Sequence, residues 1–187
     1  MAYVDLPPDE ALYHSLTDQY LEKIENKKEI IELYENLSVS NCSVSDNEAA
    51  QAAYSSKTKL GALISSGDLD VIITDKEGLE YFAQNDYLAN INTFFEKNHT
   101  TIDTDLQARI TDATRVISDN SVDTLFDSTI KYEAVTIQEP YGISLEDCTS
   151  INDSAITQPV YLAIISNIEQ TDKIIPYIEY LLNDNEP

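Results

Sequence analysis

The feature that most constrains the fold is the stretch Lys59–Asp75, which reads KLGALISSGDLDVIITD. Gly67 follows a helical pattern of apolar residues, and glycine takes up the left-handed conformation after a helix without steric cost. The run Val71-Ile72-Ile73 is β-branched, as is typical of a strand covered on both faces. Thr74-Asp75 then provides a cap for a further helix. The stretch therefore predicts a helix, a glycine stop, a buried strand and a second helix.

The rest of the chain extends this alternation of strands and helices. The spacing of apolar and turn-forming residues predicts strands over 3–6, 128–138 and 159–166, of which 128–138 has the alternation of an antiparallel or edge strand. Residues 29–39 are either a strand, which we prefer, or an extension of the preceding helix. Helices are predicted over 7–25, 47–66, 75–84, 104–118 and 171–182, with a turn at 140–145 that leads into another short strand. Strands that alternate with helices imply parallel pairing through right-handed crossovers. We expect an α/β fold, a mostly parallel sheet flanked by helices. It would form a single compact domain over residues 1–187, with residues 86–140 as a candidate sub-lobe.

The charge of the chain limits its partners. There are 34 acidic and 11 basic residues, and the formal net charge is -23. Such a chain has too few bases to neutralise phosphates, so we expect no nucleic-acid partner. The same charge disfavours docking on an anionic membrane surface.

Motifs that would indicate an enzyme are missing from the sequence. There is no Gly-x-Ser-x-Gly elbow and no glycine-rich phosphate loop, and the only histidines, His14 and His99, have no spaced metal-ligand partners. We therefore expect no enzyme activity, no metal and no cofactor. Cys42 and Cys148 could form a disulfide in an exported protein or be two buried thiols in any compartment; we prefer free thiols.

Three residues are the candidates for ligand binding: Thr74, Asp75 and Tyr141. In open α/β sheets, ligands bind beyond the carboxyl ends of the strands, where Thr74 and Asp75 would lie. Asp75 could hold a cationic or hydroxylated ligand, although its alternative role is to cap the following helix. Tyr141 lies beside Gly142 in the predicted turn between strands.

The stretch Leu60–Asp75 also resembles one that is common in type II extracellular solute-binding proteins, where a helix and a Gly-Asp-x-Asp-Val turn lead to the third strand of the first lobe. Glu80–Gln84 with Tyr87–Ile91, and the stretch 159–166, are similar to later segments of that family. The resemblance implies a type II periplasmic-binding-protein lobe with a reduced second lobe, since 187 residues are short for two complete lobes. It implies an extracytoplasmic, non-catalytic binding module.

The expected location follows from the start of the chain together with the same resemblance. Met1–Asp5 lack a basic region followed by an apolar one, so no signal peptide is visible. Because Tyr3–Pro8 resembles the end of a strand entered without a lead-in, we expect a membrane anchor or signal upstream of Met1, with the domain at the cell envelope. The partner would be a small-molecule solute or an envelope protein. The alternative is a structural or protein-interaction domain of the envelope with no small ligand, which would present a broad exposed apolar or tyrosine-rich patch.

Overall fold

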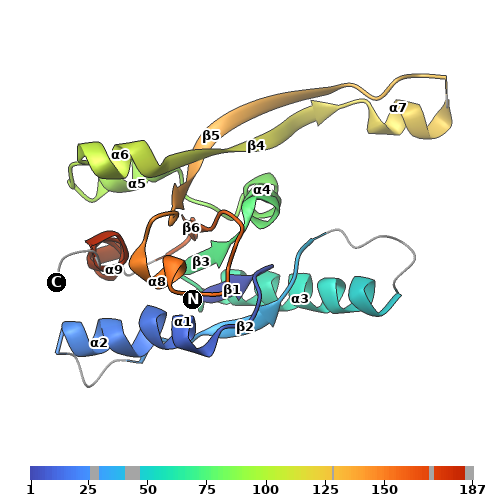
Figure 1. The fold of residues 1–187 in the computed structure, drawn as a ribbon. Coiled ribbons are helices and arrows are strands. Elements are labelled where there is room, and N and C mark those ends of the chain that lie inside the picture. The colour runs from blue at the N-terminus through green and yellow to red at the C-terminus, as the bar shows by residue number, and fades with distance from the viewer. Residues whose placement is uncertain (26–29, 41–46, 128, 169–170, 184–187) are drawn as a thin grey trace.

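A single six-stranded sheet runs through the computed structural model, which describes residues 1–25, 30–40, 47–127, 129–168 and 171–183 (Figure 1). In spatial order the strands are β2 (Tyr34–Leu37), β1 (Ala2–Val4), β3 (Val71–Thr74), β6 (Tyr161–Ile164), β5 (Ala134–Ser144) and β4 (Ile110–Asp119). Strand β1 is parallel to both β2 and β3, whereas the pairs β3–β6, β6–β5 and β5–β4 are antiparallel.

The predicted α/β class is confirmed, but the sheet is mixed and not mostly parallel. The parallel part is the half made by the alternating strands and helices of the first 75 residues. Strands β4 and β5 form a hairpin, and consecutive strands joined in this way pair antiparallel because parallel pairing needs a longer crossover. The expectation of a mostly parallel sheet depended on the first half of the chain, whereas the alternating residues of 128–138 predict an antiparallel or edge strand.

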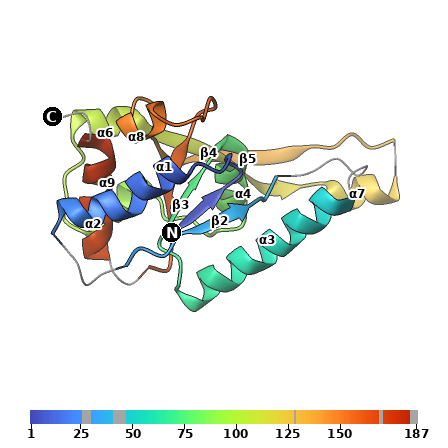
Figure 2. The ribbon, with the colours of Figure 1, turned by 60° about the horizontal axis from the view of Figure 1, so that its bottom comes forward.

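Helices cover both faces of the sheet (Figure 2). They are α1 (Glu10–His14), the π-helical turn η1 (Ser15–Gln19), α2 (Tyr20–Lys23), α3 (Asn47–Ser66), α4 (Lys76–Gln84), α5 (Ile91–Lys97), α6 (Thr104–Arg109), α7 (Ser121–Phe126), α8 (Thr149–Asn152) and α9 (Thr171–Asn183). One apolar core lies between the sheet and the helices α1, α2, α5 and α9, and the other lies between the sheet and the helices α3 and α4.

Alternate residues of β3 enter the two cores. Val71 and Ile73 pack in the first core and Ile72 packs in the second, and all three are at most 2% exposed. Successive side chains of a strand point to opposite faces, so a strand between two helical layers is apolar at every position. This explains the continuous Val-Ile-Ile run.

The central prediction over Lys59–Asp75 is confirmed. Helix α3 ends at Ser66, and Gly67 has φ of 77°, in the left-handed region. After β3, the Asp75 side chain accepts a hydrogen bond of 2.9 Å from the Gly78 backbone N–H and caps α4.

Two predictions in the second half are wrong. The helix expected over 104–118 is limited to α6, because β4 begins at Ile110 and pairs with β5 over its whole length. The turn expected at 140–145 lies inside β5. In both cases pairing between distant segments overrides the local preference.

A long arm is the most distinctive part of the molecule. Strands β4 and β5 continue beyond the sheet, with α7 at the far end (Figure 1). The pairing register shifts at Tyr141 and again at Ile117, where an extra residue is inserted. Such bulges bend and twist a strand, so they direct the arm away from the body.

Two further sequence expectations concern cysteines and membrane spans. Cys148 is buried at 2% exposure, and Cys42 lies outside the described residues, so the preference for free thiols stays a prediction. In the described parts of the chain, no helix combines the length and apolar character needed to cross a membrane.

Candidate functional site

Two acidic residues follow neighbouring strands at the point where the strand order reverses, at the carboxyl ends of β1 and β3. Asp5 follows β1 and Asp75 follows β3, and these strands are neighbours that connect onward in opposite directions across the sheet. The charge of Asp5 is among the influences that raise the pKa of Asp75, after burial of the Asp75 carboxyl itself. In open α/β sheets this reversal point is the usual place for a ligand.

Asp5 is committed to the fold by its own contacts. Its carboxylate accepts hydrogen bonds from Ser38 Oγ at 2.5 Å, from the Val39 N–H at 3.1 Å and from the Ser40 N–H at 3.3 Å. Its backbone is left-handed, with φ of 57°, which turns the chain sharply after β1. Asp5 therefore ties the end of β1 to the segment that follows β2.

Thr74 is fully buried and packs under the first turn of α4. A Cβ atom placed on Gly78 would lie 1.9 Å from Thr74 Oγ1, so only glycine allows helix and strand to approach this closely. The hydroxyl has no hydrogen-bond partner among the described residues. Its position beneath Gly78 places it in the strand–helix contact.

Asp75 is an N-cap whose charge is disfavoured by its surroundings. Burial raises the pKa of Asp75, and the hydrogen bond from Gly78 N–H opposes this shift without cancelling it. The structure thus confirms the capping role that the sequence offered as the alternative to ligand binding.

The two N-cap residues Asp75 and Asp9 should respond in opposite ways to replacement by asparagine. The raised pKa of Asp75 means that its carboxylate destabilises the fold once the pH exceeds that pKa, so D75N should raise Tm at pH 7 and the gain should vanish in acid. The pKa of Asp9 is lowered by hydrogen bonds from the Leu12 and Ala155 backbone N–H groups, so its stabilisation is present at pH 7 and is lost as the pH falls through the lowered pKa.

The matched variant D9N should therefore lower Tm at pH 7, because its amide nitrogen cannot accept the second of these hydrogen bonds. The loss should be about 1 kcal/mol, or roughly 2–4 °C for a chain of this length. Thermal unfolding of both variants between pH 3 and pH 8 tests the pair, and shifts of the same sign would contradict it.

Tyr141 is not brought together with Thr74 and Asp75. Thr74 pairs with Tyr161 of β6, which pairs with Ser144 of β5, and Tyr141 lies three residues from Ser144 along that strand. The ring is buried in the core under α3 and α4. Burial and a hydrogen bond to Glu139 raise the pKa of Tyr141, so the hydroxyl stays protonated and donates to that carboxylate at 2.8 Å.

Tyr141 instead belongs to a polar cluster that fixes the base of the arm. Arg115 of β4 donates to Tyr141 Oη at 3.0 Å and forms ion pairs with Glu139 and with Asp86, which follows α4. The side-chain amide of Gln84 pairs with the Val116 backbone, accepting at 2.7 Å and donating at 3.0 Å. These contacts attach the first part of the arm to the end of α4.

A cavity of about 570 Å³ opens at the opposite ends of these strands, beside the amino ends of β1 and β3. Met1, which precedes β1, and Val71 of β3 form its floor, and Tyr20 and Tyr177 contribute from α2 and α9. The two rings meet edge to face, with centroids 5.0 Å apart, and Tyr177 Oη donates to the Leu16 carbonyl at 2.9 Å. The Tyr177 hydroxyl therefore has a hydrogen-bond partner within the apolar wall of the cavity.

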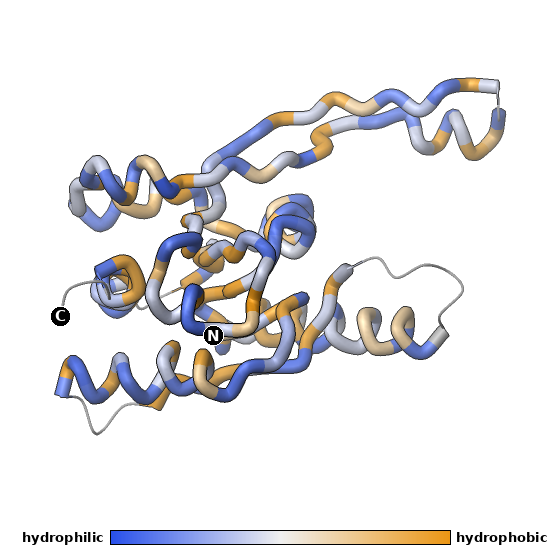
Figure 3. The backbone as a smooth tube through the Cα atoms, viewed as in Figure 1, coloured by the Kyte–Doolittle hydropathy of each residue, from blue (hydrophilic) through white to orange (hydrophobic). Residues whose placement is uncertain are grey.

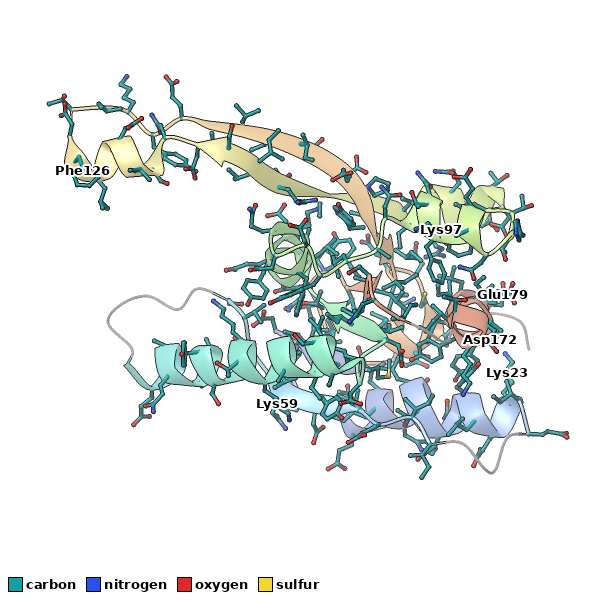
Figure 4. The ribbon with its side chains drawn as sticks, turned by 180° about the vertical axis from the view of Figure 1, so that it is seen from behind. Lys23, Lys59, Lys97, Phe126, Asp172 and Glu179 are labelled. Carbon is teal, nitrogen blue, oxygen red and sulfur yellow. The ribbon has the colours of Figure 1, made fainter. Side chains whose placement is uncertain are left out.

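The mouth of the cavity combines exposed apolar groups with carboxylates. Ile24 is 43% and Ile30 is 89% exposed there. The described lining side chains include four acids, Glu32, Asp68, Asp70 and Asp172, and one base, Lys173, and the Met1 amino group interacts with Asp70 and Glu32. Asp172 lies on α9 near the end of α2, where Lys23 is labelled in Figure 4. The rim is thus negative, and the floor is apolar and aromatic.

Sequence reasoning missed this cavity because its lining comes from segments far apart in the chain. The signal that could have indicated it is the group Ile24, Ile30 and Ile31, apolar residues placed among the charges that follow the first helix. Neither this cavity nor two smaller ones beside α6, of about 310 and 290 Å³, is lined by Thr74, Asp75 or Tyr141, so their role as ligand-binding residues stays a prediction. Across the described residues, no group of three or more His, Cys, Asp or Glu side chains is arranged to hold a metal ion.

Comparisons with known proteins give no match: no family profile, no curated protein and no solved structure is significantly similar to the chain.

Proposed function

We propose that this chain is a non-catalytic binding module that holds a small organic cation in the cavity at the amino ends of β1 and β3. The observation that carries the proposal is a cavity of about 570 Å³ with an apolar, aromatic floor and a negative rim. Cavities of about 300–1,000 Å³ with apolar walls and a few polar groups are typical of small-molecule sites.

The chemistry of the cavity selects the class of ligand. An apolar body would displace water from the floor and cover Ile24 and Ile30, which are exposed without it. A positive group would lie among Asp68, Asp70 and Asp172 at the rim, where the described side chains carry a net charge of -3 (four acids against Lys173) and the Met1 amino group offsets one of these charges. Carboxylates and phosphates would be repelled.

The family interpretation belongs to the same proposal. The parallel unit β2-β1-β3, with helices on both faces, supports a lobe of the type II solute-binding kind, with the rest of the chain in place of a full second lobe. In this interpretation the domain acts outside the cytoplasm, anchored at the envelope, and its partner is a solute. The competing interpretation, a protein-interaction domain of the envelope, is favoured by the exposed apolar residues of the arm.

A thermal-shift titration with benzylammonium, benzyl alcohol and benzoate tests the site. These probes share one apolar body and differ in charge. Benzylammonium should raise Tm, since a ligand at 100 times its Kd stabilises the native state by about 2.7 kcal/mol, or roughly 5–10 °C at this chain length. Benzyl alcohol should give a smaller shift and benzoate none. The double variant D68N/D172N should lose most of the benzylammonium shift.

The variant D75N is the matched control. It removes a carboxylate at the carboxyl end of β3, away from the cavity, and keeps an equally good cap. Its shift with benzylammonium should equal that of the unmodified chain. Loss of the shift in D75N alone would move the site to the predicted residues Thr74 and Asp75. Equal shifts for all three probes, or none for any, would contradict the proposal.

A further inference from the structure

The exposed apolar surface of the molecule is concentrated at the end of the arm. In the described part of the chain, ten large hydrophobic side chains are exposed, and seven of them lie between Ile117 and Val135. An apolar patch of this kind on a soluble surface usually marks an interaction site. Its position at the end of a projecting hairpin makes it accessible from several sides (Figure 1).

Helix α7 presents the most exposed of these side chains. Val122, Leu125 and Phe126 are 66%, 82% and 84% exposed, and their spacing of three and four residues places them on one side of a helix. No residue of α7 is buried. Figure 3 shows these hydrophobic positions at the far end of the arm, and Figure 4 labels Phe126 there.

The tip is held in shape without help from these apolar side chains. The Asn120 backbone N–H donates to the Glu133 carbonyl at 3.1 Å. The Asn120 side chain accepts from the Glu133 N–H at 2.7 Å and donates to the Lys131 carbonyl at 2.9 Å. Tyr132 Oη donates to Asp119 at 3.2 Å across the hairpin. A rigid tip loses little conformational entropy on docking, which favours binding.

The charge around the tip identifies the kind of partner. Between Ile117 and Val135 the sequence has the acids Asp119, Asp123, Asp127 and Glu133 and the single base Lys131, a net charge of -3. We propose that the face formed by Val122, Leu125 and Phe126 docks into an apolar recess with a basic rim on another protein. The aromatic and leucine side chains would be the buried anchors, and the surrounding carboxylates would pair with the rim.

The same charges disfavour two other occupants. A second copy would bring a net charge of -23 against a tip that is itself negative. An anionic bilayer would repel the four carboxylates that surround the apolar face. A partner with a positively charged surface around an apolar recess is complementary both to the apolar face and to the carboxylates that surround it.

Site-specific photocrosslinking of the full chain tests the docking surface. Phe126 is replaced by benzoylphenylalanine, the protein is crosslinked in an extract of its native cells, and the captured protein is then produced in pure form. Calorimetry with the unmodified chain, F126S and Y54S follows at two salt concentrations. Tyr54 is the matched control because it is 74% exposed on α3, away from the tip.

We expect F126S to bind the purified partner at least about tenfold more weakly, as is usual for a buried aromatic anchor. Y54S should bind within about twofold of the unmodified chain, and raising the salt should weaken binding. The proposal is overturned if no protein is captured, or if F126S binds the partner normally. It is also overturned if F126S instead abolishes self-association in sedimentation, or binding to phosphatidylcholine vesicles.

Discussion

Gly78→Ala should destabilise the protein by about 2–3 kcal/mol, although alanine is the better helix former by about 1 kcal/mol. The added Cβ would lie 1.9 Å from Thr74 Oγ1 and 3.2 Å from Thr74 Cβ. Thr74 is β-branched, fully buried and paired with Tyr161 in the sheet, so it cannot move aside without disturbing β3. Helix α4 must therefore move away from the strand. Urea unfolding with an unchanged m value would measure this loss.

Gly61→Ala is the control for Gly78→Ala. Gly61 lies within α3, and a Cβ there would meet only Tyr87 Oη, at an ordinary 3.7 Å. G61A should therefore stabilise the protein by up to about 1 kcal/mol. The double variant T74A/G78A should be less damaged than the sum of the single variants, because T74A removes the nearest obstructing atom. Equal effects of G61A and G78A would contradict the close strand–helix approach.

Asp5→Ala should also cost about 2–3 kcal/mol, the range expected for hydrogen bonds to a charged group. The variant would remove the acceptor for Ser38 Oγ and for the Val39 and Ser40 N–H groups, and Val39 is only 2% exposed. Alanine is also poorly suited to the left-handed backbone at this position, where φ is 57°. Chemical denaturation at pH 7 would measure the difference.

Asp5→Asn separates the two causes of this loss. Asparagine tolerates the left-handed conformation and keeps one acceptor oxygen, so D5N should lose about half as much stability as D5A. If D5N were as damaging as D5A, the carboxylate charge would account for the whole effect. If both variants were neutral, the link from β1 to the segment after β2 would be unimportant for stability.

The first half of the fold was predictable because local signals and tertiary structure agree there. Gly67, the Val-Ile-Ile run and the cap at Asp75 each specify one conformation, and the structure contains all three. The arm was not predictable in the same way. Ile110 and Ala113 fit a helical spacing as well as a strand, and the pairing of β4 with β5 decides between them.

The candidate site was less accessible to sequence reasoning than the fold. Thr74 and Asp75 could be placed after a strand, but not the burial of the Thr74 hydroxyl under Gly78. Pro140 and Gly142 predict a turn around Tyr141, yet these residues form a bulge within β5. The cavity depends on Met1 and on side chains from α2, β3 and α9, a convergence that no local pattern encodes.

The attachment of the arm to α4 also shields a sheet edge. Strand β4 is the last in the order, and an edge strand offers unpaired N–H and C=O groups to any other chain. Here the Gln84 amide occupies both backbone groups of Val116, and Lys76 Nζ donates to the Asp112 carbonyl. Side chains of one helix thus act in place of a seventh strand. The inner part of β4 is closed to β-sheet extension, which protects a protein with so long a hairpin from stacking edge to edge.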